Sequence, residues 1–241
     1  MNKQYELIIK RTKLIYTVEN HSINDNIINL FVHSEDRMKR NTSYNLILGS
    51  SSPRRIELLT NVGYDFQVIK SGYHERMLEK ASIKKFLVYN TQSKLAKILD
   101  DHPHLKVKKN LVLTADTIVT VNSEIIGKPK NKEDASNTLK KLSNSYHSVL
   151  TCVNLSSFNE DQILKNQTII VETKVKFKKL NRDEIIQYVE TEEPMDKAGS
   201  YAIQGLGSFM VESINGSYTN VMGLPLVETI KLIENIDNNI K

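Results

Sequence analysis

The chain has 241 residues, of which 39% are apolar and 25% charged, a balance typical of a globular protein with a hydrophobic core. No apolar run reaches the roughly 18 residues that a membrane-spanning helix needs, so we expect no membrane partner. The net charge of +5 is spread over scattered lysines, without a basic run interleaved with aromatic residues. That distribution argues against a nucleic-acid partner.

Cys152 is the one cysteine of the chain, so no internal disulfide can form. It lies among apolar residues of an expected strand, which predicts a buried and unreactive thiol. An unpaired thiol is typical of a reducing compartment, and the N-terminus shows no signal-peptide pattern. We therefore expect a cytoplasmic protein.

Two regions differ in composition. Residues 1–43 contain clusters of Asn, His and Ser and end in a polar run, which predicts an extension that is partly ordered at best. From residue 44 to residue 241, apolar strands and amphipathic helices alternate, which predicts one α/β domain with a mixed sheet. The expected strands are 45–49, 65–69, 111–115, 117–121, 147–155, 168–177 and 208–214, and the expected helices are 53–62, 80–99, 132–142, 182–190 and 225–236.

The segment 46–59 predicts an anion site at the start of a helix. Ser52 suits the N-cap and Pro53 the first helical position, after an apolar strand and a small-residue turn. Arg54 and Arg55 then lie in the first turn, where backbone N–H groups and the helix dipole attract an anion such as a phosphate chain. The alternative is a pair of solvated surface charges.

Two further positions carry candidate chemistry. Asp116 follows the apolar run 111–115, and ligands in open α/β sheets bind beyond the carboxyl ends of strands. It is placed as a general base for water or as a metal ligand, the alternative being an aspartate that starts a turn. Gly127 and Pro129 shape a turn that presents Lys128 either to a phosphate or to solvent.

The long, turn-rich segment 193–207 is a candidate binding loop, because loops of this length are more often functional than structural. Its Gln204 carries an amide that can read the edge of a base or face water. The chain contains no P-loop, no Rossmann glycine pattern, no G-x-S-x-G elbow and no Cys/His zinc spacing.

Five segments in this order resemble the Maf family of nucleoside triphosphate pyrophosphatases, and the resemblance covers about residues 45–236. The pairing of Pro-Arg-Arg in the first segment with Ile-Gln-Gly in the fourth is similar to the subfamily that acts on dTTP and UTP. The matching segments are 49–59, 115–119, 126–129, 193–205 and 216–226.

The resemblance implies a Maf/Ham1-like (ITPase-like) α/β fold with a mixed, twisted sheet, flanking helices and a central cleft. It implies an enzyme that hydrolyses dTTP and UTP, and modified pyrimidine nucleotides, to the monophosphate and pyrophosphate as nucleotide-pool housekeeping. A divalent cation, Mg²⁺ or Mn²⁺, and a homodimer are part of the same expectation. Hydrolysis of the anhydride needs an oriented water, a base and neutralisation of phosphate charge, which the residue types supply.

The resemblance also assigns roles to individual residues. Asp116 falls on the family's proton acceptor, and whether it acts mainly as base or as metal ligand stays open. Glu75 falls on an acidic position associated with the metal, so Glu75 and Asp116 are the two expected metal ligands. The substrate-binding positions are Ser50, Arg54, Arg55, Lys94, Thr117, Lys128 and Gln204, of which Arg54, Thr117 and Gln204 are expected to set specificity.

The chain departs from the family pattern in three places. Glu192 and Cys152 stand where the family has glycine, and so does Ala202. Because Glu192 lies at the mouth of the long loop, it could change loop geometry or substrate access. One alternative is therefore the same reaction on a different base. The resemblance leaves a second alternative open, a nucleotide-binding regulator of cell division or septum formation with little turnover.

Overall fold

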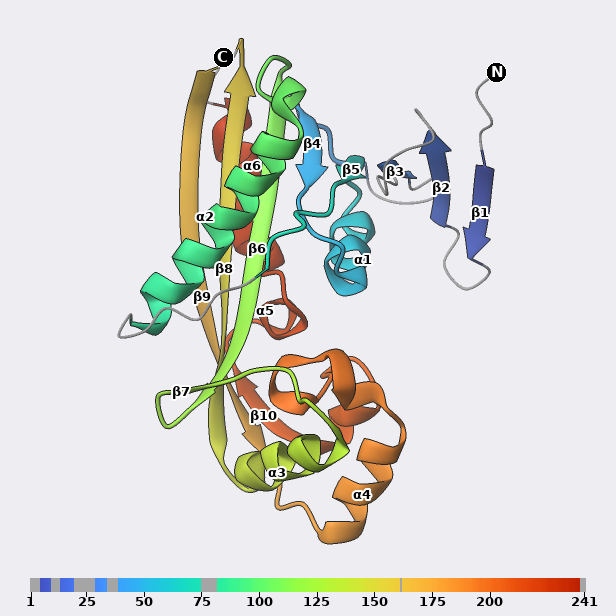
Figure 1. The fold of residues 1–241 in the computed structure, drawn as a ribbon, viewed down its shortest axis with the longest axis vertical. Helices are drawn as coiled ribbons and strands as arrows, with labels where there is room; N and C mark the ends of the chain where they lie inside the picture. The colour runs from blue at the N-terminus through green and yellow to red at the C-terminus, as the bar shows by residue number, and fades with distance from the viewer. Residues whose placement is uncertain are drawn as a thin grey trace.

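The computed structural model describes residues 5–9, 14–19, 29–33, 39–74, 82–160 and 162–238. Within these residues ten strands form one mixed sheet in the order β1-β2-β3-β5-β4-β6-β8-β9-β10, and β7 pairs with β6 off this path (Figure 1). The strand β4 runs parallel to both β5 and β6, whereas the other pairings are antiparallel.

The strands are β1 (Tyr5–Ile9), β2 (Leu14–Glu19), β3 (Asn29–His33), β4 (Asn45–Leu48), β5 (Phe66–Val68), β6 (Asn110–Val121), β7 (Glu124–Ile126), β8 (Tyr146–Asn159), β9 (Gln162–Phe177) and β10 (Val211–Asn215). The α-helices are α1 (Pro53–Asn61), α2 (Ile83–Asp101), α3 (Lys132–Leu142), α4 (Arg182–Glu190), α5 (Tyr218–Met222) and α6 (Leu226–Asn238). Short 3₁₀ helices are η1 (Pro103–Leu105), η2 (Glu193–Asp196), η3 (Ala198–Ser200) and η4 (Leu206–Met210).

The expected mixed α/β fold is confirmed, with corrections in detail. The two strands expected at 111–115 and 117–121 are one strand, β6, because residues 110–120 pair with β8 without a break. The last strand begins at residue 211 rather than 208, since η4 occupies 206–210. The short elements β7 and α5 were not predicted, nor were the three strands within residues 1–43, which extend the sheet beyond β5.

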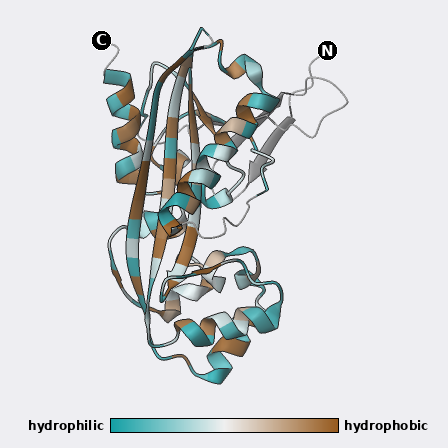
Figure 2. Ribbon diagram, turned by 60° about the vertical axis from the view of Figure 1, so that its left-hand side comes forward, coloured by the Kyte–Doolittle hydropathy of each residue, from teal (hydrophilic) through white to brown (hydrophobic). Residues whose placement is uncertain are grey.

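Helices cover both faces of the long strands. In Figures 1 and 2, α2 lies across one face of β6 and β8 and α6 lies against the other, and hydrophobic residues run along the strands between them. Side chains alternate along β6 as a strand requires. Leu111 and Leu113 pack in the cluster that contains α6, whereas Val112 and Ile118 pack against α2.

The β4–α1 connection is tightly built. A Cβ atom at Gly49 would lie 2.5 Å from Ile98 Cδ1 and 2.7 Å from Thr114 Cγ2, so only glycine lets the chain leave β4 here. The helix α1 begins with Pro53 at its first position, as predicted, but the side chain of the N-cap Ser52 makes no capping hydrogen bond. Gly63, with a φ of 87°, ends the turn that follows the helix.

This connection leaves a gap beside β6. The last residue of β4, Leu48, pairs with Leu113, and β7 joins the same edge of β6 only from Val119 onward. In the described part of the chain, residues 114–118 of β6 therefore have a strand neighbour on one side alone. This position, at the carboxyl end of β4, is where ligands bind in open α/β sheets.

None of the helices in the described residues is both long and apolar enough to cross a membrane.

Candidate functional site

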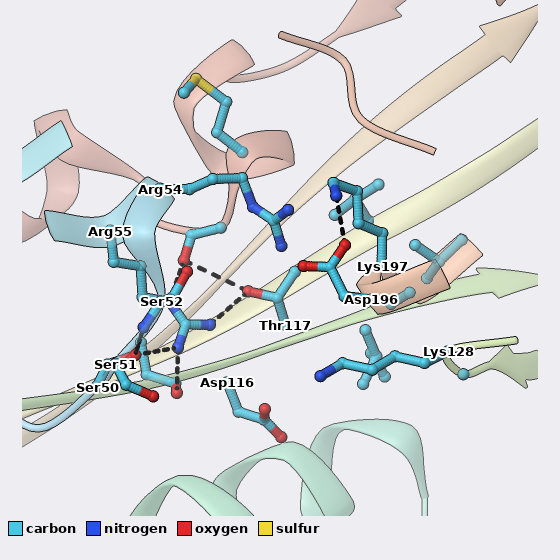
Figure 3. A pocket seen from close by; sticks show the side chains of 18 of the residues that line it. Ser50, Ser51, Ser52, Arg54, Arg55, Asp116, Thr117, Lys128, Asp196 and Lys197 are labelled. Carbon is cyan, nitrogen blue, oxygen red and sulfur yellow. Dashed lines mark hydrogen bonds and ion pairs between the residues drawn. The ribbon is translucent and has the colours of Figure 1, made fainter. Parts of the chain in front are cut away.

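A cavity of about 1020 Å³ opens at the gap beside β6 (Figure 3). Its walls come from the β4–α1 turn, the open edge of β6, the turn after β7 and the segment 196–204. Glu75, expected as a metal ligand, lies outside the described residues. The structure brings together the other expected site residues in the cavity lining: Ser50, Arg54, Arg55, Lys94, Asp116, Thr117, Lys128 and Gln204.

Asp116 points to the α2 side of the sheet, where Lys94 Nζ donates to its Oδ1 at 2.8 Å. Both residues are at least nine-tenths buried. An ammonium this close stabilises negative charge on the carboxylate, which a base or a metal ligand must carry. The continuity of β6 corrects the expected position of Asp116, which lies within a strand rather than at its end. The strand that ends at the cavity is β4.

Arg55 is bound mainly to the protein itself. Its Nε donates to Gly223 O at 2.7 Å, its Nη1 donates to Ser50 Oγ at 3.1 Å and to Ala115 O at 2.9 Å, and its Nη2 donates to Thr117 Oγ1 at 3.0 Å. These bonds join α1, β6 and the α5–α6 turn. The guanidinium therefore organises the cavity wall and contributes a fixed positive charge to it.

Thr117 faces the opposite side of β6 from Asp116 and belongs to a chain of hydroxyl and amide contacts. Its Oγ1 lies 3.0 Å from Thr151 Oγ1 on β8, and Thr151 Oγ1 donates to Asn220 O at 3.2 Å. Asn220 Nδ2 donates in turn to Thr173 Oγ1 at 3.0 Å. This buried network fixes the α5 turn, and with it Gly223, against the sheet.

The cavity lining is strongly basic. Among the described lining residues, six cations face two carboxylates, Asp116 and Asp196. Arg54 and Lys128 reach toward the same space from opposite walls in Figure 3. A surplus of this size favours a ligand with several negative charges, such as a triphosphate. The six cations are Arg54, Arg55, Lys70, Lys94, Lys128 and Lys197.

Sequence reasoning had not singled out Lys70, Asp196 or Lys197. Lys197 Nζ donates to Glu193 O at 2.8 Å and pairs with Asp196. Burial acts to raise the pKa of Asp196, but the Lys197 hydrogen bond and the nearby Arg54 charge outweigh it, so this pKa lies below its usual value. Asp196 and Lys197 are part of a segment that matches the family, a signal that could have found them; Lys70 carried no comparable signal.

Gln204 is exposed at the cavity wall, within an irregular segment. Just before this segment, Glu192 adopts a left-handed backbone with a φ of 62° and a ψ of −1°. Glycine adopts this conformation without strain, so the glycine of the family pattern suits this position. The departure at Glu192 therefore keeps the turn, and its side chain does not line the cavity.

Beneath this segment lies an aromatic cluster. Tyr201 lines the cavity, and its hydroxyl is 2.9 Å from His147 Nε2, while Phe177 meets both rings edge to face. Burial lowers the pKa of His147 to about 4. The imidazole is therefore neutral near pH 7 and acts as a core residue.

Cys152 is buried, as expected, and burial is the chief reason why the pKa of its thiol is raised.

A family model described as "Maf-like protein" matches residues 45–236. A dTTP/UTP pyrophosphatase of Dictyoglomus thermophilum is 40% identical over 79% of this chain and 95% of its own length. Proteins of the same name from Colwellia psychrerythraea (41% identical, 86% of this chain, 95% of the relative) and a Clostridium botulinum strain (43%, 78% and 97%) are similarly close. The match spans the β4–α1 connection, the open edge of β6 and the segment 193–207, so the chain belongs to the family of Maf-like proteins.

Proposed function

We propose that this protein hydrolyses dTTP and UTP to the nucleoside monophosphate and pyrophosphate. The observation that carries the proposal is that one basic cavity gathers Asp116, Arg54, Lys128 and Gln204. The printed names of the relatives, dTTP/UTP pyrophosphatase, support the same reaction. A nucleotide-pool role, turnover of modified pyrimidine nucleotides, a homodimer and a cytoplasmic location follow the resemblance and belong to this proposal.

In the proposed reaction, a water molecule attacks the α-phosphorus of the nucleoside triphosphate. The Asp116 carboxylate, held by Lys94, orients this water and accepts its proton as the new P–O bond forms. The P–O bond to the bridging oxygen breaks, and pyrophosphate leaves. Arg54 and Lys128 offset the charge that develops on the phosphate oxygens, and Arg55 keeps the wall in place.

A divalent cation fits the donor set. In the described residues, His, Cys, Asp and Glu side chains form no group of three or more that could hold a metal. Mg²⁺ is commonly held by one or two carboxylates together with substrate phosphates, so Glu75 and the nucleotide would hold it, and Asp116 would be a ligand only as the alternative to its role as the base. When bound, the cation would neutralise phosphate charge.

Base selection is assigned to Gln204, Thr117 and Arg54. The Gln204 amide offers donors and an acceptor, which matches the mixed donor and acceptor edge of uracil or thymine. Ser50 lies on the turn where the phosphate chain would meet α1, and its hydroxyl is already fixed by Arg55. These roles require that the nucleotide lies across the cavity from the β4–α1 turn to Gln204.

The test is pyrophosphate release from a panel of nucleoside triphosphates with Mg²⁺ or Mn²⁺, comparing the wild type with Asp116→Asn. We expect turnover of dTTP and UTP, reduced at least about 10³-fold in the variant because the base is lost, with nucleotide binding retained. Turnover of other nucleotides alone would reassign the base specificity. A silent panel with nucleotide still bound would replace the enzyme by a nucleotide-binding regulator.

A further inference from the structure

The backbone around Gln204 is held from beneath by two side chains, Tyr188 of α4 and Glu193 of η2. Tyr188 Oη accepts the Ala202 N–H at 3.2 Å and donates to Glu193 Oε1 at 2.9 Å. The Glu193 carboxylate also accepts two backbone N–H groups, those of Leu206 at Oε2 and of Gly207 at Oε1, both at 3.0 Å. We call these two side chains the Tyr188–Glu193 clamp.

Two glycines make room for this clamp. A Cβ atom at Gly205 would lie 2.3 Å from Glu193 Oε2, and one at Gly207 would lie 2.7 Å from Tyr188 Oη. Both glycines therefore serve the close approach of side chains to the loop. The N-cap of η4, Gly205, has no side chain that could cap this helix, and the Glu193 carboxylate supplies the missing acceptor.

The clamp is chemically suited to hold its geometry. The Glu193 carboxylate accepts three hydrogen bonds at once, from the Tyr188 hydroxyl and from two backbone N–H groups. Burial, followed by the hydrogen bond to Glu193, raises the pKa of Tyr188, so its phenol stays protonated and continues to donate. Ala202, Leu206 and Gly207 are thereby anchored on both sides of Gln204.

Glu193 also connects the clamp to the charged part of the cavity wall. Glu193 opens η2, which ends at Asp196, and the Glu193 carbonyl accepts the hydrogen bond from Lys197. The clamp thus sets the position of Gln204 relative to Asp196 and Lys197. It does not line the cavity itself, since neither Tyr188 nor Glu193 belongs to the lining.

We propose that Glu193, acting with Tyr188, is a positioning residue that determines base specificity by fixing Gln204 against the base of the nucleotide. This inference rests on the proposed function and deepens it. A hydrogen bond is lost when donor and acceptor separate beyond about 3.5 Å, so a small displacement of the loop removes base discrimination. The β4–α1 turn has its own hydrogen bonds and keeps its position, so phosphate binding is unaffected.

The experiment compares Glu193→Gln with Glu192→Gln. The two variants make the same chemical change at neighbouring positions, but the Glu192 side chain is 73% exposed and outside the clamp. For each we would measure kcat and KM for dTTP and dCTP with Mg²⁺. We expect Glu193→Gln to lower kcat/KM for dTTP about tenfold through KM, with dCTP changed less than about twofold. Glu192→Gln should leave the ratio of the two substrates unchanged.

A second, milder variant tests the clamp in case Glu193→Gln does not fold. Tyr188→Phe removes one hydroxyl and keeps the ring that packs against Phe209, and we expect it to lower the dTTP:dCTP ratio by roughly three- to fivefold. A double variant tests the route of action. If Glu193 acts through Gln204, Glu193→Gln causes no further loss of selectivity in a Gln204→Ala background.

An unchanged dTTP:dCTP ratio in Glu193→Gln, or equal losses on both substrates, would overturn the positioning role while leaving the proposed function intact. Additive losses of selectivity in the double variant would do the same. A wild type that hydrolyses neither nucleotide contradicts the proposed function instead. In that case binding of α,β-methylene dTTP and dCTP, measured by calorimetry on the same variants, tests the clamp separately.

Discussion

The two walls of the cavity are built by different means. The β4–α1 wall consists of a strand, a short turn and a regular helix, and three hydrogen bonds from the Arg55 guanidinium tie it to β6 and the α5–α6 turn. The opposite wall, residues 193–207, contains η2, η3 and the start of η4, with positive φ angles at Gly199 and Ser200. The first wall is therefore built of regular elements, whereas the second is irregular and depends on the side chains of Tyr188 and Glu193.

The largest effect on the β4–α1 wall is expected from Arg55→Lys. Lysine has no planar fork and cannot reach four acceptors, so the carbonyl groups of Gly223 and Ala115 lose buried partners. We expect the free energy of unfolding to fall by about 3 kcal/mol, as measured by urea denaturation. The matched change Arg54→Lys, at a position without such bonds to the protein interior, should alter stability by less than about 0.5 kcal/mol. Equal losses in both variants would contradict the organising role of Arg55.

The protein should lose stability in acid through His147, which lies on β8 beneath the second wall and contacts Tyr201 of that wall. The pKa of His147 is about 4 in the folded protein and 6.5 in the unfolded chain, so the unfolded chain binds this proton first. The neutral His147 imidazole makes its full contribution to the free energy of unfolding above about pH 6.5. This contribution is lost as the pH falls toward 4, and the total loss is about 3 kcal/mol. Urea denaturation between pH 4.5 and 7.5 should show this slope, which His147→Gln should reduce and the exposed His104→Gln should not.

Gly49→Ala tests how closely the first wall is packed. The added methyl group would lie within 2.7 Å of both Ile98 and Thr114, so α2 or β6 must shift. Overpacking of this kind costs about 1–3 kcal/mol, measurable as a lower midpoint of thermal unfolding. The control is Gly127→Ala, where nothing lies within 4 Å of the new atom; a comparable loss there would show that packing is not the cause.

The smallest expected effect is a gain from Glu192→Gly. A left-handed residue other than glycine costs about 1–2 kcal/mol, and the added flexibility of glycine in the unfolded chain offsets about 0.4–1 kcal/mol of this. We expect stability to rise by about 0.5–1 kcal/mol in urea denaturation. Glu190→Gly, which loses an ion pair with Lys132 but lies at the last position of α4, should lower it by about 1 kcal/mol. Glu192 also forms an ion pair with Lys132 at 3.8 Å, and a loss of stability in Glu192→Gly would show that this ion pair outweighs the backbone strain.

The comparison of the walls also explains what the sequence could reveal. The β4–α1 wall depends on a strand and on a proline at a helix start, which are local signals, and these predictions are confirmed. Three of the four acceptors of Arg55 are not local, because Ala115, Thr117 and Gly223 lie 60, 62 and 168 residues away. The sequence therefore indicated Arg55 as basic but gave no sign that its donors are largely used by the protein.

The second wall could be predicted only in part. Gln204 was identified by its amide and by the family resemblance, whereas Glu193 drew no attention because its role depends on Tyr188 and on two glycines. The strand break predicted at Asp116 was also wrong. A charged residue in an apolar run predicts a break, but β6 continues because β8 pairs with it throughout.

The open edge of β6 has one further consequence. Asp116 and Thr117 are consecutive, and the alternation of the strand sends one toward α2 and the other toward α1. A shift of β6 by one residue would exchange the two faces, placing the threonine beside Lys94 and the carboxylate elsewhere. Such an exchange needs no change in either residue. Substitutions can tune this site gradually, but a single-residue insertion or deletion between residues 110 and 115 would dismantle it.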